Sequence, residues 1–184
     1  MSNREITGMY PGSFDPITIA HVGIVERAAN LLDRLYVAVA FNPTKNHMFD
    51  IDDRVRLVRE SIGHVANAEV VCLEKGLTID HAKKLDARTL VRGTRSVTDF
   101  LDEIQLFEQH IYLQTARGIR PGDPDFVDTQ TYYALPENDH ISSSFVRGLY
   151  MVEGIHNRGE LIKPLVPPCV SQALQKKDQQ TTTL

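Results

Sequence analysis

The first residues that could do chemistry lie near the start of the chain, in the string Gly12-Ser13-Phe14-Asp15-Pro16-Ile17-Thr18-Ile19-Ala20-His21. Ser13 and Thr18 carry hydroxyl donors, and His21 falls in the first turn of an expected helix. Gly12 allows the backbone to approach a ligand closely. A helix N-terminus presents unpaired backbone N–H groups and the positive end of the helix dipole, and both favour a bound phosphate. The string therefore predicts a nucleotide site, although each residue alone would fit an ordinary turn or a helix cap.

A second string, His140-Ile141-Ser142-Ser143-Ser144, stands before another expected helix and places Arg147 one turn later. Three hydroxyls and the backbone N–H groups of a helix start can hold the phosphates of a nucleotide. Serine clusters in such positions often act only as helix caps, so that alternative stays open. The pattern favours a second phosphate-binding helix start.

Charged side chains stand between the two strings. Arg92 and Arg95 flank Gly93 after an expected strand, where two guanidinium groups form a multidentate phosphate clamp. Surface salt bridges are the alternative for these two arginines. Lys45 follows another expected strand, and by itself it would be an ordinary solvated lysine. Glu103 lies among other acids on the next expected helix and by itself would face solvent.

The elements that must position these residues alternate between strand and helix. The apolar run over residues 34–41 is continuous, as in strands that are buried on both faces of a parallel sheet. The expected strands cover residues 6–10, 34–41, 68–73, 87–91 and 131–135. The expected helices begin at about residue 21, cover residues 51–63 and 77–85, follow Arg95 as a long helix, start at Ser142, and end with a short helix that Pro167 and Pro168 open. A loop is expected over residues 116–128.

This alternation predicts an α/β fold, with a Rossmann-like, doubly wound sheet of five parallel strands in a single domain. We expect the domain to cover residues 1–174 and a polar C-terminal tail to cover residues 175–184. Ligands of such sheets bind at the carboxyl ends of the strands, and the polar clusters described above follow expected strands. The clusters should therefore line one crevice, although they lie far apart in the sequence.

The composition is that of a globular protein without a nucleic-acid partner. The 184 residues carry a net charge of −4 and the isoelectric point is near 6.0, whereas proteins held by nucleic-acid phosphates are usually basic. Cys72 and Cys169 stand far apart without metal-ligand spacing, so we expect free thiols and no protein-bound metal. No apolar segment approaches the roughly twenty residues of a membrane helix and no signal peptide precedes the first strand, which predicts a cytoplasmic protein.

The two strings resemble the signatures of the nucleotidyltransferase superfamily. The first string follows its G-x-F-D-P pattern, and residues 141–147 follow its pattern of Ile, three hydroxyl residues and a basic residue. Thr18, the segment Arg92-Gly93-Thr94-Arg95 with Asp99-Phe100 after it, and Leu165-Val166-Pro167-Pro168 resemble the phosphopantetheine adenylyltransferases of coenzyme A biosynthesis. The resemblance covers nearly the whole chain. It implies a Rossmann-like domain, usually assembled as a hexamer, that transfers AMP from ATP with Mg²⁺ to 4′-phosphopantetheine and yields dephospho-coenzyme A and pyrophosphate.

The resemblance also implies roles for individual residues. For catalysis it implies His21, Lys45 and Arg92, with His21 and the Ser13 hydroxyl stabilising the α-phosphate under attack. For 4′-phosphopantetheine it implies Ser13, Lys45, Thr78 and Arg92. For ATP it implies Ser13, Phe14, His21, Gly93, Thr94, Arg95, Glu103, Asn138, Asp139, His140, Ile141, Ser142, Ser143 and Ser144. Because the attacking group is already a phosphate anion, positioning and charge neutralisation suffice, and no nucleophilic side chain is needed.

Several positions depart from the family pattern. Ala20 replaces a glycine, Thr94 replaces a leucine, and His140 replaces an aromatic or apolar residue. The segment Gln109-His110-Ile111 stands where the family usually has Met-Asn-Arg, close to the pantetheine pocket. The expected loop over residues 116–128 is also longer than usual. The changes at 109–111 leave the acceptor open.

Two alternatives therefore remain at this stage. The chain could transfer a nucleotide to another phosphorylated acceptor, such as nicotinamide mononucleotide or glycerol 3-phosphate, but Thr18 stands where those relatives tend to have histidine. It could also be a nucleotide-binding regulator without catalysis. The presence of His21, Lys45 and Arg92 favours an active enzyme over a regulator.

Overall fold

The computed structural model describes residues 5–41, 46–152 and 158–181, and in these ranges strands alternate with helices as the sequence predicts. The strands are β1 (Thr7–Gly12), β2 (Arg34–Ala40), β3 (Ala68–Leu73), β4 (Thr89–Thr94) and β5 (Asp128–Tyr133). The helices are α1 (Ile19–Ala29), α2 (Ile51–Ile62), α3 (Thr78–Lys84), α4 (Val97–Thr115), α5 (Ser143–Met151), α6 (Arg158–Ile162) and α7 (Pro168–Thr181). Two short 3-10 helices are η1 (Pro136–Asn138) and η2 (Lys163–Leu165).

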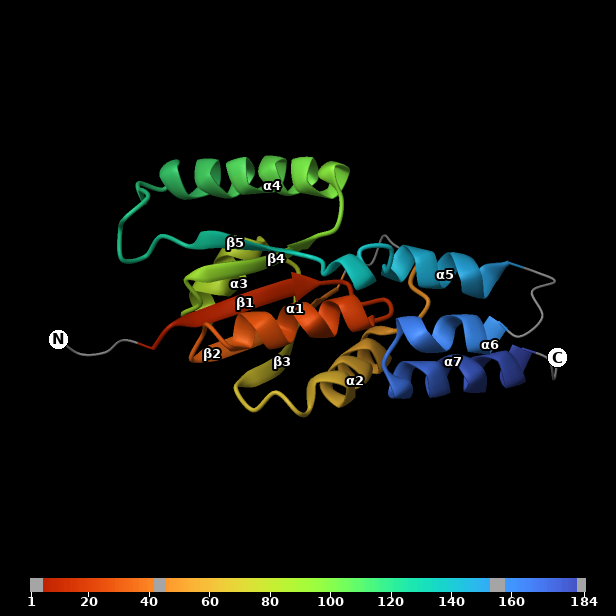
Figure 1. Ribbon diagram of the computed structural model, residues 1–184. Helices are drawn as coiled ribbons and strands as arrows, with labels where there is room; N and C mark the ends of the chain where they lie inside the picture. Colours follow the sequence, from red (N-terminus) through yellow and green to blue (C-terminus); the bar gives the residue numbers. More distant parts are fainter. Residues whose placement is uncertain (1–4, 42–45, 153–157, 182–184) are drawn as a thin grey trace.

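The five strands form one parallel sheet in the order β3-β2-β1-β4-β5. This confirms the predicted doubly wound, Rossmann-like sheet. The strand order reverses between β1 and β4, and in such sheets the crevice for a ligand opens at that reversal, beyond the carboxyl ends of the strands. In Figure 1 β1 points toward the end of the molecule where α5, α6 and α7 lie. The fold therefore places the polar strand ends next to the C-terminal helices.

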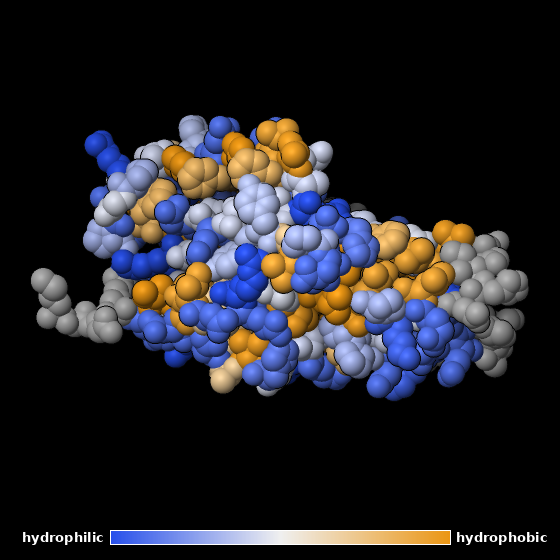
Figure 2. Space-filling model, viewed as in Figure 1, coloured by the Kyte–Doolittle hydropathy of each residue, from blue (hydrophilic) through white to orange (hydrophobic). Residues whose placement is uncertain are grey.

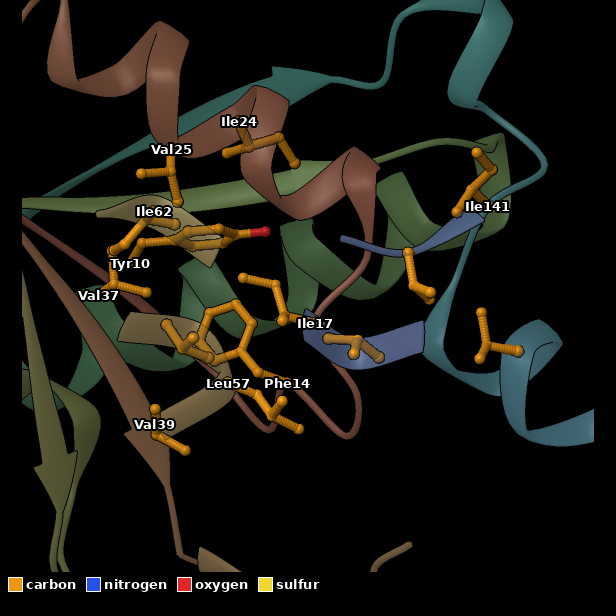
Figure 3. Packing of buried hydrophobic residues seen from close by; sticks show 14 of the residues in the cluster. Tyr10, Phe14, Ile17, Ile24, Val25, Val37, Val39, Leu57, Ile62 and Ile141 are labelled. Carbon is orange, nitrogen blue, oxygen red and sulfur yellow. The ribbon is translucent and has the colours of Figure 1, made fainter. Parts of the chain in front are cut away.

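Two apolar clusters hold helices against the two faces of the sheet. The larger cluster joins α1, α2, α5 and α7 to one face and includes Val25, Leu57, Val146 and Val170. The smaller cluster joins α3 to the other face. Figure 3 shows Tyr10 and Phe14 in the larger cluster, with residues of α1, β2 and α2 around them. Helices cover both faces of β2, and this explains its apolar sequence: Leu35, Val37 and Val39 are fully buried on one face, and Ala38 is buried on the other.

Several element ends differ from the sequence predictions. β1 continues to Gly12, where the sequence predicted an end at Tyr10. β4 continues to Thr94 instead of ending at Val91, because its last residues pair with β5. β5 begins at Asp128 and ends at Tyr133, which shifts it toward the N-terminus of the chain relative to the predicted 131–135. α7 continues to Thr181, where the sequence predicted a tail from Gln175, since lysine and glutamine are good helix formers. The division of the chain after residue 174 stays a prediction.

α4 is a long helix with little cover. Of its 19 residues only His110 and Gln114 are buried. The Gln114 side chain fixes the helix to the start of β5: Nε2 donates to the carbonyl of Val127 at 2.9 Å, and Oε1 accepts from the Val127 N–H at 2.8 Å. In Figure 1 α4 lies along one edge of the molecule. Neither α4 nor any other helix in the described ranges is both long and apolar enough to cross a bilayer.

Candidate active site

A pocket of about 340 Å³ opens at the carboxyl ends of β1 and β4. It brings together the two helix starts that carry the sequence strings, those of α1 and α5. The pocket is lined by Tyr10, Ser13, Ala20, His21, Ile24, Gly93, Thr94, Arg95, Asp99, Ala134, Ile141, Ser142, Ser143, Ser144 and Arg147. The predicted convergence of distant polar clusters is thus present in the fold.

The start of α1 fixes the His21 ring and its proton. The N–H of Thr18, the N-cap residue, donates to Nδ1 of His21 at 3.1 Å, and Oγ1 of Thr18 lies 2.9 Å from the same nitrogen. Because a backbone N–H can only donate, Nδ1 accepts, and the neutral ring carries its proton on Nε2. Burial and the nearby Arg95 charge lower the pKa of His21 to about 4. His21 is therefore a neutral N–H donor near pH 7.

The loop between β1 and α1 is held from the start of α5. The Arg147 guanidinium donates from Nη1 to the carbonyl of Asp15 at 2.6 Å, and the Ser143 hydroxyl donates to the carbonyl of Pro16 at 2.8 Å. The Asp15 carboxylate accepts from the N–H groups of Met48 and Phe49 at 2.8 and 2.9 Å. Hydrogen bonds therefore connect the two sequence strings to each other and to the segment before α2.

A buried arginine supports the same loop from below. Arg54 of α2 is 1% exposed, and its Nη1 donates to the carbonyls of Ser13 at 2.7 Å and Ala40 at 3.0 Å. Its Nε is buried and has no partner in the described part of the chain. Burial lowers the pKa of the guanidinium, and the Asp15 charge opposes that shift. Arg54 thereby fixes the carboxyl ends of β1 and β2 beside Ser13.

The three serines at the start of α5 make different contacts. Ser142 is the N-cap, and its Oγ accepts from the Phe145 N–H at 3.0 Å. Ser143 binds the loop described above, and Oγ of Ser144 accepts from Nη2 of Arg147 at 3.1 Å. All three serines line the pocket, so the cap and the phosphate-binding interpretation of this string are compatible.

The end of β4 supplies two ion pairs. Arg92 binds Glu103 of α4 through two parallel contacts, Nε to Oε2 at 2.6 Å and Nη2 to Oε1 at 2.7 Å. Arg95 donates from Nε to Asp99 at 2.9 Å. The first pair is mostly buried, and neither of its members lines the pocket, whereas Arg95 and Asp99 both do. The two arginines that the sequence grouped as one clamp therefore lie in different surroundings.

Comparison with known proteins gives the family. Residues 9–149 match the model of the cytidylyltransferase-like family. Phosphopantetheine adenylyltransferase from Carboxydothermus hydrogenoformans is 37% identical over 171 residues, which cover 93% of this chain and 95% of that protein. The protein of the same name from Gloeobacter violaceus is 39% identical over 146 residues, which cover 79% of this chain and 84% of that protein. The chain belongs to the phosphopantetheine adenylyltransferases, within the cytidylyltransferase-like proteins.

A solved structure supports the fold of this phosphopantetheine adenylyltransferase family member. Nicotinic acid mononucleotide adenylyltransferase from Plasmodium falciparum, solved in complex with NaAD, superposes with a TM-score of 0.70. The superposition covers 95% of this chain and 97% of that chain at 18% identity. At that identity the likeness concerns the fold, which agrees with the Rossmann-like sheet predicted from the sequence.

Most of the residues predicted to bind ATP line the pocket, namely Ser13, His21, Gly93, Thr94, Arg95, Ile141, Ser142, Ser143 and Ser144. Phe14 lies beneath them, 2% exposed, with its ring 5.4 Å from that of His21 in an edge contact. Asn138, Asp139 and His140 lead into the pocket without lining it. Their roles as ligands of ATP stay predictions.

The residues predicted for 4′-phosphopantetheine are more dispersed. Ser13 lines the pocket, and Arg92 lies behind it, paired with Glu103. Thr78 is the first residue of α3 and does not line the pocket. Lys45 lies outside the described residues. Ser13 and Arg92 therefore both lie near the carboxyl ends of β1 and β4. Their contacts with the acceptor stay predictions.

Several residues of the site were not predicted from the sequence. Asp99 lies in the first turn of α4, four residues after Arg95, which precedes the helix, and the two side chains form an ion pair. Arg54 lies three residues before Leu57 and four before Val58, so it shares the apolar face of α2 with them. Its burial could have been inferred from this spacing. Tyr10 looked like an ordinary strand residue. No sequence signal points to Ala134, which reaches the pocket only because β5 pairs with β4.

Proposed function

We propose that this chain transfers the AMP group of ATP to 4′-phosphopantetheine and releases pyrophosphate. The observation that carries the proposal is the meeting of the α1 and α5 helix starts in one pocket with His21 and Arg95. Two helix starts and a guanidinium suit the charge of a triphosphate. The acceptor is inferred from the relatives named phosphopantetheine adenylyltransferase.

The reaction needs an in-line displacement at the α-phosphorus of ATP. An oxygen of the acceptor phosphate forms the new bond, and the bond between the α-phosphorus and the oxygen bridging to the β-phosphate breaks. We propose that Nε2–H of His21 and the Ser13 hydroxyl donate to the α-phosphate oxygens, where negative charge accumulates. A neutral donor suits this task because no proton has to leave the attacking phosphate. Gly93, Arg95 and the α5 serines would hold the remainder of ATP.

We propose that Arg92, with Lys45, holds the acceptor phosphate. In the structure the Arg92 guanidinium is oriented by its two contacts with Glu103, and Nη1 lies 3.4 Å from the carbonyl of Pro11. A bidentate carboxylate fixes the plane of a guanidinium and thus the direction of its free N–H groups. Glu103, which the family resemblance assigns to ATP, would therefore also orient Arg92.

We propose that magnesium enters as part of the substrate, bound to the phosphates of ATP. Among the described residues no three histidine, cysteine or acidic side chains lie close enough together to hold a metal ion. Phosphate oxygens are hard ligands that Mg²⁺ prefers, and in such sites the ion commonly keeps several waters. The protein groups in this mechanism act on the phosphates directly.

We propose that the enzyme works as a homo-oligomer, a hexamer by family resemblance, with α4 in an interface. Leu101 of α4 is 54% exposed and Tyr112 is 72% exposed. Figure 2 shows apolar side chains along this helix on the visible face. A long helix with exposed apolar side chains and few buried ones is typical of an element that packs against a partner.

We also propose a cytoplasmic location. Cys72 and Cys169 are both free, as expected for a protein in a reducing compartment. ATP, the proposed substrate, is likewise found in that compartment.

The test is release of pyrophosphate by the full chain in the presence of Mg²⁺. Three reactions run side by side: ATP with 4′-phosphopantetheine, ATP with nicotinamide mononucleotide, and CTP with glycerol 3-phosphate. Release with 4′-phosphopantetheine alone is expected. Release only with another acceptor would keep the mechanism and overturn the substrate, and binding of ATP without release in any reaction would point to a regulator.

A further inference from the structure

Tyr10 of β1 lies under the pocket and is not among the residues assigned to the site by the sequence. Its side chain is only 5% exposed, and its ring contacts Phe14 edge-on at 5.4 Å between centroids. In Figure 3 the hydroxyl points away from Val37 and Ile62, toward the side on which Ile141 lies. Tyr10 and Ile141 both line the pocket, so the ring belongs to the core while its polar end reaches the ligand site.

The Tyr10 hydroxyl has no hydrogen-bond partner among the described residues. A Cβ on Gly93 would lie 3.3 Å from this oxygen, so the hydroxyl abuts the last residues of β4. The oxygen opens on the pocket that Tyr10 lines, and the hydroxyl of a mostly buried tyrosine usually has a hydrogen-bond partner. Burial raises the pKa of the phenol, so the group keeps its proton and remains a donor. The fold gains no bond from this oxygen, and phenylalanine would pack equally well.

Charges locate the hydroxyl more closely. The Arg92 charge opposes the rise in the Tyr10 pKa and the Glu103 charge adds to it, so both side chains lie within electrostatic reach of the phenol. Arg92 is the residue proposed above to hold the acceptor phosphate, and Tyr10 lines the pocket proposed for ATP. The hydroxyl therefore lies at the pocket proposed for ATP, within electrostatic reach of Arg92.

We propose that the Tyr10 hydroxyl donates a hydrogen bond to a phosphate oxygen of bound ATP, and this inference rests on the proposed function. The phosphate supplies the partner that the protein lacks. A hydrogen bond to a charged acceptor is stronger than one between neutral groups, and its loss corresponds to a change of about 10- to 100-fold in affinity. The neutral phenol thus adds to the donors of His21 and Ser13 without adding charge.

The test compares Tyr10→Phe with the wild type and with Tyr132→Phe. Tyr132 is a matched control, because it is also buried and its hydroxyl is also without a partner, but it does not line the pocket. Calorimetry gives the Kd for ATP and for adenosine, pyrophosphate release gives kcat/KM, and thermal unfolding gives Tm. For Tyr10→Phe we expect a Kd for ATP at least tenfold higher, a matching fall in kcat/KM, and an unchanged Tm and Kd for adenosine. Tyr132→Phe should match the wild type throughout.

An ATP affinity for Tyr10→Phe within twofold of the wild type would overturn the inference. So would an equal loss of adenosine affinity, which would assign the hydroxyl to the nucleoside, or a fall in Tm that accounts for the weaker binding. Failure of the proposed function is distinguishable, because it appears as absence of pyrophosphate release in the wild type with 4′-phosphopantetheine.

Discussion

Replacement of Arg54 with methionine, an uncharged side chain of similar length, removes a buried cation beside the candidate active site. Its Nη1 donates to the carbonyls of Ser13 and Ala40, and both carbonyls would lose that donor. A buried polar group left without its partner costs about 1–3 kcal/mol, so two carbonyls correspond to about 2–6 kcal/mol. Removal of the partnerless Nε relieves a desolvation cost and moves the estimate to the lower half of that range.

We therefore expect Arg54→Met to lower the free energy of unfolding by about 3 kcal/mol. For a chain of this length that corresponds to a fall in Tm of about 6–12 °C. The displaced Ser13 carbonyl should also disturb the loop between β1 and α1, so the KM for ATP should rise. Urea unfolding and scanning calorimetry at one protein concentration measure the first effect, and pyrophosphate release measures the second.

Arg56→Met is the matched control on the same helix. Arg56 is exposed and pairs with Asp53 and Glu60 on the surface of α2. Exposed ion pairs contribute about 0–1 kcal/mol, so this variant should unfold nearly as the wild type does. If Arg54→Met lost less than about 1 kcal/mol, the two carbonyl contacts would not support the loop and the reasoning would be refuted.

Three further substitutions test the other parts of the site. His21→Ala should lower kcat by about 100-fold and leave the Kd for ATP near that of the wild type. The folded pKa of His21, about 4, lies below the unfolded value of 6.5. The stability contributed by the neutral ring is therefore full above pH 6.5 and declines as the pH falls toward 4. Urea unfolding across that range should show a smaller decline in the free energy of unfolding for His21→Ala than for the wild type. Arg92→Lys keeps the charge but loses the bidentate contact with Glu103, so the KM for 4′-phosphopantetheine should rise about tenfold while the Kd for ATP stays constant. Leu101→Asp should lower the molar mass measured by light scattering, and an unchanged mass would remove Leu101 from any interface.

The sequence determined the architecture because its signals are local. The continuous apolar run of β2 indicates burial on both faces, and the helix caps at Thr18, Asp50 and Ser142 follow from residue type and position. Alternation of strands and helices then leaves few topologies, because parallel crossovers are right-handed. The two signature strings gave about half of the pocket lining for the same reason, since each is a short segment at a helix start.

Element ends and side-chain partners were decided by the tertiary structure. The ends of β4 and β5 depend on the pairing of these two strands. Arg92 and Arg95 are nearly adjacent in sequence, yet Arg92 pairs with Glu103 behind the pocket whereas Arg95 lines the pocket. The reason is that successive side chains at the end of a strand point to opposite faces of the sheet.

The chemistry of individual side chains depends on such long-range contacts. The sequence determined that His21 stands at a helix start, but only the folded chain buries the ring and brings Arg95 near it, and both lower its pKa. Arg54 contacts a carbonyl 41 residues away, and the Tyr10 side chain is part of the core while it also lines the pocket. Local sequence fixes which elements form, because propensity and periodicity act over a few residues, whereas burial and charge at a site are summed over all the elements that meet there.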